Sequence, residues 1–345
     1  MLGSIYQPPT GGIYYDPNAP KTQYNVQNWG LDRIDQRDLP MNGTYTYTNT
    51  GAGVNVYNID SGIRPTHQEF GGRAFLAADV IGDGYNGQDC SGHGTAVAGI
   101  IGGSTHGVAK GVRIHSVRVY DCSGYGWVSN FIAGIDWVTA NHVKPAVANI
   151  EVATGGPYEP LDAAVSRLIS AGVTCVVAAG NDSQDVVNSS PGRVAGAITV
   201  GASSYPQYSW GGEYRASFSN YGPGIDVYAP GTSIITASFV SDTDTTLFAG
   251  TSAATPFVAG VAARYIQRNP GASPATVSLA IKSNATTTQF ISRLLYSAFD
   301  MAWQPPPPTC KPGDKEACED FGGTWNSSTC TCSSICFSKP WLCGY

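Results

Sequence analysis

Short apolar runs rich in valine and isoleucine recur along the chain, and segments with helical periodicity separate several of them. The runs occupy residues 54–59, 112–120, 146–153, 173–180, 197–202 and 225–230. Apolar residues at helical spacing predict helices over 128–142, over 161–172, and in the segment that follows Ser252. Continuous apolar strands that alternate with helices indicate a parallel sheet with helices on both faces. The pattern predicts an α/β domain of three layers.

The helix expected after Ser252 has an unusual surface. Its sequence, TSAATPFVAGVAARYIQ, is apolar or small on every side, which is typical of a helix that runs through the centre of a domain. Proline is tolerated in a helix only near the first turn, so Pro256 places the start of this helix close to Ser252.

Composition narrows the class of protein. The chain has 345 residues, of which 13% are charged and 42 are glycine, and its formal net charge is −6. This composition suits a compact secreted protein with many tight turns, and it offers no basic footprint for nucleic acid. No apolar run is long enough to span a bilayer. The first residues lack the basic and apolar segments of a signal peptide, so we expect a mature form or an incomplete chain.

Three glycine-rich segments carry an ordered set of reactive residues. Asp60 lies in YNIDSGI (57–63), His93 in SGHGTAVAGIIGG (91–103) and Ser252 in GTSAATPFVAG (250–260). A serine hydroxyl becomes a nucleophile when an imidazole takes its proton, and a carboxylate must orient that imidazole. Asp60 follows an apolar strand, where the reactive groups of parallel sheets gather. His93 and Ser252 open helices, with glycines at 92, 94 and 250 that allow close approach of the backbone.

Together these segments resemble the subtilisin-like serine proteases, most closely the proteinase K and aqualysin branch. The resemblance covers roughly residues 24–300 and includes WGLDRIDQRDLP (29–40), GVAKGVRIHSVRVYDCSG (107–124), IAGIDWV (132–138), AAGND (178–182), SFSNYGPGIDVYAPGTSI (217–234) and VAGVAA (258–263). It implies the subtilisin-like fold and a secreted serine endopeptidase of broad specificity, which cleaves extended polypeptides through an acyl-enzyme.

The resemblance also implies a role for each reactive residue. Ser252 is expected to be the nucleophile, His93 the general base and then acid, and Asp60 the orienting carboxylate. Asn181, which follows the run 173–180, matches the side-chain donor of the oxyanion hole, whose second donor is the Ser252 N–H. Asn181 is also a glycosylation sequon with Ser183, but a glycan would block this role. We therefore expect a bare side chain that faces the cleft.

Two segments are implied to bind substrate. Ser123, Gly124, Tyr125 and Gly126 match an edge strand that pairs with an extended substrate, a mode that gives affinity with little sequence preference. Tyr125 and its neighbour Trp127 are either surface aromatics or parts of apolar subsites.

The second segment departs from the family pattern. Where the branch has a small-residue run, residues 149–157 read NIEVATGGP, one residue longer, and put Glu151, Val152 and Ala153 at the wall of the primary specificity pocket. Glu151 has three readings: it points into solvent, it gives the pocket a preference for basic side chains, or it marks an inactive protein. In the last case the chain is a structural or interaction subunit of an extracellular assembly.

Structural calcium is the cofactor that the resemblance implies. Calcium prefers clusters of oxygen ligands, and the alternative at each position is a plain solvated carboxylate. One expected site has Asp226 with carbonyls near Ala195 and Ala197, and a second has Asp32, Asp35 and Gln36. Asp79 and Asp83 are weaker candidates for a third site.

Nine cysteines point to an oxidising, extracellular compartment. The resemblance implies a disulfide between Cys90 and Cys122, whereas Cys175 is expected to be a buried free thiol in a strand. Six further cysteines crowd the end of the chain, at positions 310, 318, 330, 332, 336 and 343. Sequons suggest a glycoprotein and occur at Asn42, Asn181, Asn188, Asn284 and Asn326.

The chain is expected to divide into four parts. They are an N-terminal extension (1–23), the peptidase domain (24–303), a proline-rich linker (304–308) and a C-terminal module (309–345). The module has too few apolar residues for a core, so we expect a disulfide staple, with metal binding through the Cys-Thr-Cys spacing as the alternative. Such appendages often associate with surfaces, polymers or other chains, while the domain itself binds polypeptide substrates.

Overall fold

A computed structural model describes residues 20–205, 213–288 and 291–297, together with the backbone of 324–326 and 331–333. The chain forms two compact units, Met1–Asp300 and Met301–Tyr345. Within the second unit, β12 (Thr324–Asn326) pairs antiparallel with β13 (Thr331–Ser333). The expected disulfide pairing of the C-terminal module lies outside the described residues.

A seven-stranded parallel sheet forms the middle of the first unit. Its strand order is β4-β5-β3-β6-β7-β8-β9. The strands are β3 (Asn55–Asp60), β4 (Ala74–Asp79), β5 (Arg113–Arg118), β6 (Ala146–Ile150), β7 (Thr174–Ala178), β8 (Ile198–Ser203) and β9 (Val227–Pro230). All neighbours run parallel, which confirms the predicted sheet.

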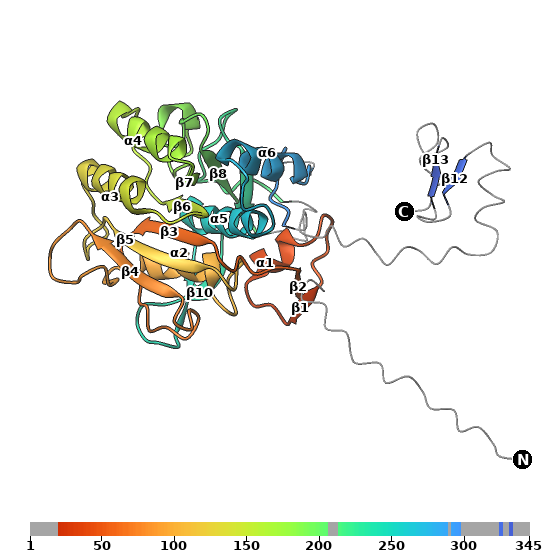
Figure 1. The fold of residues 1–345 in the computed structure, drawn as a ribbon, viewed down its shortest axis with the longest axis horizontal. Helices are drawn as coiled ribbons and strands as arrows, with labels where there is room; N and C mark the ends of the chain where they lie inside the picture. Colours follow the sequence, from red (N-terminus) through yellow and green to blue (C-terminus); the bar gives the residue numbers. More distant parts are fainter. Residues whose placement is uncertain (1–19, 206–212, 289–290, 298–323, 327–330, 334–345) are drawn as a thin grey trace, which may run out of the picture. The chain divides into compact units, whose positions relative to one another are not determined.

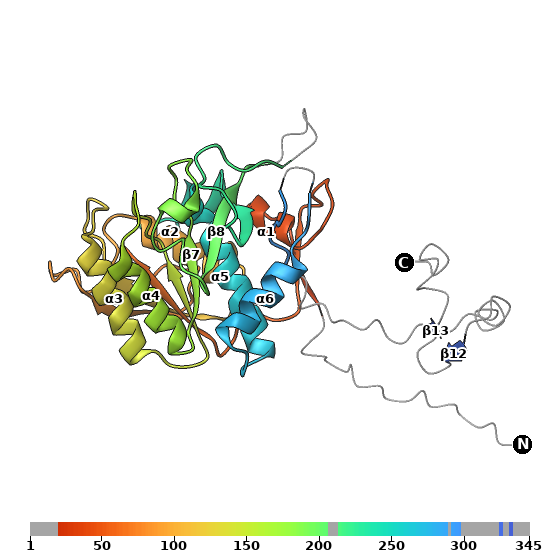
Figure 2. The same cartoon turned by 90° about the horizontal axis from the view of Figure 1, so that it is seen from above.

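Helices cover the sheet on both faces (Figure 1). On one face, α2 (His93–Gly102) and α5 (Thr251–Arg268) pack into a large apolar core. On the other face, α3 (Val128–Asn141) and α4 (Glu159–Ser170) pack into a second apolar core. The predicted three-layer α/β architecture is therefore confirmed. The view from above shows α6 (Pro274–Asn284) beside α5 (Figure 2).

The helix α5 is the central helix that its sequence predicts. It begins at Thr251, one residue before Ser252, and most of its residues are buried, including Phe257. Pro256 lies in its second turn, where its missing N–H leaves the Ser252 carbonyl without an intrahelical donor.

Smaller elements surround the sheet. The strand β1 (Lys21–Tyr24) pairs antiparallel with β2 (Thr44–Tyr47). A second hairpin joins β10 (Ile234–Ala237) to β11 (Thr245–Phe248). The remaining elements are α1 (Trp29–Ile34) and a 3₁₀ turn at Val186–Asn188. Among the described residues, no helix has both the length and the hydrophobicity needed to cross a membrane.

Candidate active site

Asp60 and His93 meet at the carboxyl end of the sheet. Asp60 is the last residue of β3 and is fully buried, while His93 is the first residue of α2 and its side chain is 32% exposed. The imidazole Nδ1 lies 2.7 Å from Asp60 Oδ1, which also accepts a hydrogen bond of 2.6 Å from the Ser61 N–H. This pairing fixes the ring and leaves Nε2 facing the pocket.

The backbone around His93 needs glycine on both sides. Gly92 has a φ of 99°, in the left-handed region that favours glycine. A Cβ atom on Gly94 would lie 2.1 Å from the Gly62 carbonyl oxygen, so only glycine lets α2 approach the loop after β3 this closely. These contacts hold His93 against Asp60.

Asp89 holds the start of α2, a role that the sequence analysis missed. Its Oδ1 accepts hydrogen bonds from the N–H groups of Ser91 (3.0 Å) and Gly92 (2.8 Å), and its Oδ2 accepts from the Thr95 N–H (2.9 Å). A carboxylate at a helix N-terminus satisfies free N–H groups and complements the helix dipole. The signal in the sequence is an aspartate four residues before the glycine-flanked histidine, together with a threonine two residues after that histidine.

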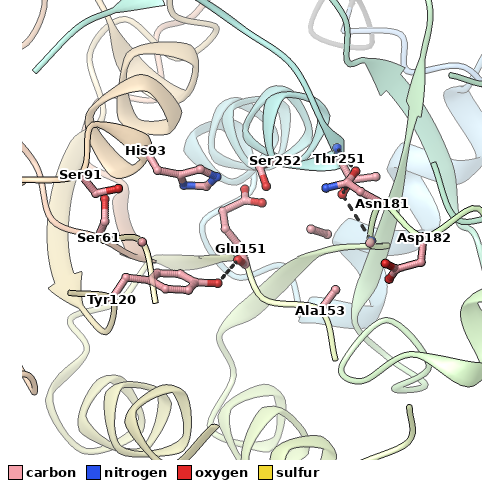
Figure 3. Close-up of a pocket in the computed structure, with 13 residues that line it drawn as sticks. Ser61, Ser91, His93, Tyr120, Glu151, Ala153, Asn181, Asp182, Thr251 and Ser252 are labelled. Carbon is pink, nitrogen blue, oxygen red and sulfur yellow. Dashed lines mark hydrogen bonds between the residues drawn. The ribbon is translucent and has the colours of Figure 1, made fainter. Parts of the chain in front are cut away.

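Ser252 comes from α5 and lines the same pocket as His93. As the second residue of the helix, it has a backbone N–H with no intrahelical acceptor. In the described part of the chain, no hydrogen bond joins Ser252 to His93. The Ser252 hydroxyl instead faces the carboxyl group of Glu151 (Figure 3).

Asn181 follows β7 and points its amide across the pocket toward the start of α5 (Figure 3). Its Oδ1 accepts hydrogen bonds from the Thr251 N–H (2.9 Å) and the Thr251 hydroxyl (3.1 Å). Because the oxygen is already engaged, the NH₂ group is left as the free donor of this exposed side chain. Asn181 and Ser252 thus each place a free N–H donor at the same end of the pocket.

Glu151 is buried, so the expectation that it could point into solvent is wrong. It directly follows β6, is only 5% exposed, and extends its carboxyl group to between His93 and Ser252 (Figure 3). Asn149 Nδ2 donates to Glu151 Oε1 at 2.9 Å, and the Tyr120 hydroxyl donates to the Glu151 carbonyl at 2.7 Å. The residue therefore stands beside the reactive groups and not at the protein surface.

Electrostatics shift the pKa of both His93 and Glu151. Burial alone would lower the pKa of His93, but the charge of Asp60 and the hydrogen bond to it prevail and raise this pKa to about 9. Burial raises the pKa of Glu151 well above its usual range, and the negative charge of Asp60 adds to the effect. His93 acts in the opposite direction on Glu151, because an imidazolium stabilises a nearby carboxylate.

The pocket has a volume of about 340 Å³, and many of its lining residues have small side chains. Its lining residues are Ser61, Ser91, His93, Tyr120, Gly124, Glu151, Ala153, Ala178, Gly180, Asn181, Asp182, Thr251 and Ser252. Val152, expected at the wall, instead turns its side chain into the core under α3 and α4. The alternation of side chains along an extended backbone explains this placement, because Glu151 and Val152 point in opposite directions.

The expected edge strand over residues 123–126 forms a turn. Asp121 N–H donates to the Tyr125 carbonyl (2.9 Å), and Asp121 Oδ1 accepts from the Ser123 N–H (2.9 Å). Of the four residues, only Gly124 lines the pocket, while the side chains of Tyr125 and Trp127 are 55% and 66% exposed and stack edge to face.

The comparisons with known proteins agree with this geometry. The profile described as "Subtilase family" matches residues 51–299. The chain belongs to the subtilase family.

Two relatives are extracellular or alkaline proteases by name. The chain is 56% identical over 258 residues to the "Extracellular serine proteinase" of Thermus sp. (strain Rt41A), covering 75% of this chain and 61% of that protein. It is 46% identical over 278 residues to "Alkaline serine exoprotease A" of Vibrio alginolyticus, covering 79% of this chain and 50% of that protein. The chain thus spans between half and about three fifths of these relatives.

A solved structure shares the fold closely. The crystal structure of "a cold adapted subtilisin-like serine proteinase" superposes with a TM-score of 0.73 at 44% identity, covering 79% of this chain and 98% of that one.

One expected calcium site of this subtilase contains buried oxygen atoms that no hydrogen bond of the described residues uses. Asp32 accepts backbone hydrogen bonds from Asn42 (3.1 Å) and Gly43 (2.8 Å), and Asp35 Oδ2 accepts one from Thr46 (2.6 Å). Asp35 Oδ1 and Gln36 Oε1 are buried without a hydrogen-bond partner among the described residues. Burial, followed by the nearby Asp32 charge, raises the pKa of Asp35 to about 7. This set of buried oxygens fits a calcium ion.

The carboxylates of the other two expected calcium sites form ion pairs with lysine or arginine side chains. Asp226 Oδ1 lies 3.0 Å from Lys282 Nζ, and its Oδ2 accepts from the Thr199 N–H at 3.0 Å. Lys282 therefore already neutralises the carboxylate expected to act with the carbonyls of Ala195 and Ala197. Asp79 and Asp83 both pair with the buried Arg118, at 3.0 and 2.5 Å. In the described residues, no cluster of three or more His, Cys, Asp or Glu side chains could hold a metal.

The disulfide prediction is confirmed. Cys90 and Cys122 are bonded, joining the loop before α2 to the loop after β5, and Cys175 in β7 carries a buried free thiol as expected. The disulfide lies close to the pocket, since Ser91 and Gly124, each near one of the bonded cysteines, line it.

Proposed function

We propose that this subtilase is a secreted serine endopeptidase that hydrolyses extended polypeptides with broad specificity, through an acyl-enzyme on Ser252. The observation that carries the proposal is the His93–Asp60 hydrogen bond of 2.7 Å in a pocket that Ser252 also lines. The disulfide and the names of the extracellular relatives support secretion.

In this mechanism, His93 Nδ1–H donates to Asp60 and leaves Nε2 free to accept the Ser252 proton. Ser252 Oγ then attacks the substrate carbonyl carbon, and the imidazolium gives its proton to the leaving amine. Water repeats the sequence to release the acyl group. Asp60 holds the ring and stabilises its charged form throughout, and its burial strengthens that interaction.

The negative charge that develops on the substrate oxygen needs donors already in place. Asn181 Nδ2 and the Ser252 N–H would supply them, because Thr251 holds the Asn181 oxygen away from the substrate. This role requires an unmodified Asn181, as expected from the sequence.

The proposed specificity follows from the pocket walls. Gly124, Ala153, Ala178 and Gly180 leave room for side chains of different kinds, which supports broad specificity. For the substrate backbone to pair with residues 123–126, either the turn at Asp121 must open, or the substrate must bind the backbone groups of the turn that are not hydrogen bonded within it. A preference for basic side chains next to Glu151 remains a proposal, tested by comparing lysine and phenylalanine at the residue before the cleaved bond.

We also propose that Asp32, Asp35 and Gln36 hold a structural calcium ion. The ion would supply the positive charge that the buried Asp35 carboxylate lacks, and so stabilise the loop between α1 and β2. The pairing of Asp226 with Lys282 argues against a second ion at Asp226.

The direct test is hydrolysis of casein by the pure protein in calcium, compared with Ser252→Ala. The expected result is clearance by the wild type and a loss of at least about 10³-fold in the variant, because the covalent step needs the hydroxyl. Full activity in Ser252→Ala would refute the assignment. No activity in the wild type, together with large particles, would instead favour a structural subunit.

The C-terminal module adds a second proposal. Its six cysteines and the preceding prolines suggest an appendage that binds surfaces, polymers or other chains. Retention on polysaccharide with and without residues 305–345 tests that role and leaves the catalytic proposal untouched.

A further inference from the structure

Glu151 is a buried acid with no task in the mechanism described above. Its carboxyl group lies between the imidazole and the nucleophile, and an ordinary structural glutamate would be fully hydrogen bonded or exposed to water. Here Asn149 satisfies Oε1, while Oε2 is buried with no hydrogen-bond partner in the described residues.

A buried polar chain fixes the position of this carboxyl group. Asn58 Nδ2 donates to the Gly94 carbonyl at 3.1 Å, and Asn58 Oδ1 accepts from Asn149 Nδ2 at 3.0 Å. Asn149 donates in turn to Glu151, so the base of α2 and the Glu151 side chain are held by one network. Asn58 and Asn149 are 1% and 0% exposed, and Glu151 cannot swing into water without breaking this network.

The groups that face Glu151 decide its charge. They are Asp60 on β3, His93 on α2, Tyr120 after β5 and Ser252 on α5. Asp182 lines the far side of the pocket. Tyr120 stays protonated, because burial and the charges of Asp60 and Glu151 raise its pKa. Of these groups, only His93 can become a cation.

Two buried carboxylates, those of Asp60 and Glu151, therefore compete for one imidazolium, and the half-buried Asp89 before α2 adds a third negative charge near the ring. A charged His93 stabilises the ionised form of Glu151, and a neutral His93 favours a protonated Glu151. One proton serves both side chains: it sits on the carboxyl oxygen, which leaves the imidazole free as a base, or on the imidazole, which blocks it.

We propose that Glu151 is a further catalytic residue of this subtilase, whose carboxyl group faces the Ser252 hydroxyl and shares one proton with His93, and so sets the pH at which Ser252 becomes a nucleophile. The inference rests on the proposed function. In the resting site Glu151 faces Ser252, and an ionised Glu151 keeps the proton on His93. Activity then appears only at a pH where the imidazole is released.

The test is the pH dependence of kcat/KM for the wild type, Glu151→Gln and the control Glu159→Gln. Gln keeps the shape of Glu151 but cannot ionise, and Glu159 is an exposed glutamate at the start of α4. The wild type should gain activity toward about pH 9, the pKa of His93. In Glu151→Gln the rising limb of this pH profile should move to lower pH by at least about one unit. At the low-pH end of that rise, kcat/KM relative to its maximum should then be about tenfold higher than in the wild type.

An unchanged limb in Glu151→Gln, or the same shift in Glu159→Gln, would overturn the inference. The position of the limb does not depend on how much of the variant folds, and the smaller Glu151→Ser should show the same direction of shift. If the wild type hydrolyses nothing, the proposed function has failed. Proton sharing between Glu151 and His93 is then tested by a second measurement that needs no enzymatic activity.

That second measurement is the NMR titration of ¹³C-labelled histidine in the wild-type protein, with the His93 signal identified by its loss in His93→Gln. Proton sharing predicts a titration in two steps or one broadened well beyond a single ionisation. A simple single-step curve, unchanged in Glu151→Gln, would contradict it.

Discussion

The amide group of Asn181 is oriented by hydrogen bonds to its oxygen atom. Both of the hydrogen bonds that Oδ1 accepts come from Thr251, the residue before the nucleophile. An asparagine amide has one acceptor and one donor end, so this anchoring commits the donor end to the pocket. The two proposed oxyanion donors thus depend on the same turn at the start of α5.

This arrangement predicts the effect of Asn181→Ala. We expect kcat to fall roughly 10²–10³-fold with little change in KM, the size known for the matching donor in subtilisin, a relative of this chain. Steady-state kinetics on a peptide substrate measure it, with the exposed Asn188→Ala as a control that keeps full activity. A loss below about threefold would remove Asn181 from the oxyanion site.

The reactive residues illustrate what a sequence can predict at this scale. Asp60 and His93 could be paired in advance because each lies in a glycine-rich segment at an element boundary, and the structure joins them. Glu151 could be flagged as a departure, but not placed. Its burial depends on the register of β6 and on the Asn58–Asn149 network, which assemble only when distant strands pair.

At the scale of elements, the loop between α1 and β2 is built around carboxylates. Asp32 and Asp35 accept backbone hydrogen bonds from residues 42, 43 and 46, and so shape the return of the chain. The buried Asp35 has a pKa raised to about 7, above its unfolded value. In metal-free protein this carboxyl therefore favours folding less as pH rises from about 4 to about 7.

Calcium should reverse that loss. At a concentration about 100 times the dissociation constant, binding should stabilise the fold by about 2.7 kcal/mol, which is a rise in Tm of about 5–10 °C. The rise should be larger at pH 8 than at pH 5, because the ion binds the ionised form of Asp35. Thermal unfolding with calcium and with a chelator measures it.

Two variants locate the ion. Asp35→Asn should abolish most of the calcium-dependent rise, whereas Asp226→Asn should keep it, because Lys282 already neutralises Asp226. A rise that persists in Asp35→Asn and disappears in Asp226→Asn would place the ion at the other site.

Elements were predictable to the extent that their pattern is local. All six apolar runs became strands of the sheet, because buried parallel strands must be apolar on both faces. The edge strand β4 was missed, since its half-exposed residues carry no such run. The turn at 123–126 was also not predicted. Its backbone N–H groups donate to the Asp121 carboxylate and not to a neighbouring strand.

At the scale of the whole molecule, the site is assembled from both halves of the first unit. Asp60 and His93 come from elements near the amino end, while Asn181 follows a later strand of the same sheet and Ser252 opens α5, which packs directly against α2. The disulfide between Cys90 and Cys122 closes a loop beside the pocket. Since a cross-link of this span restricts the unfolded chain, it stabilises the folded site by about 3–4 kcal/mol.

The central claim is that Ser252 is a nucleophile activated by His93. Treatment with a serine-directed phosphonyl fluoride, followed by mass spectrometry of the intact protein and its peptides, tests it most directly. The account predicts one label per chain on Ser252, complete loss of hydrolysis, and no labelling in Ser252→Ala or His93→Gln. Labelling at another residue, or hydrolysis that survives full labelling of Ser252, would contradict it.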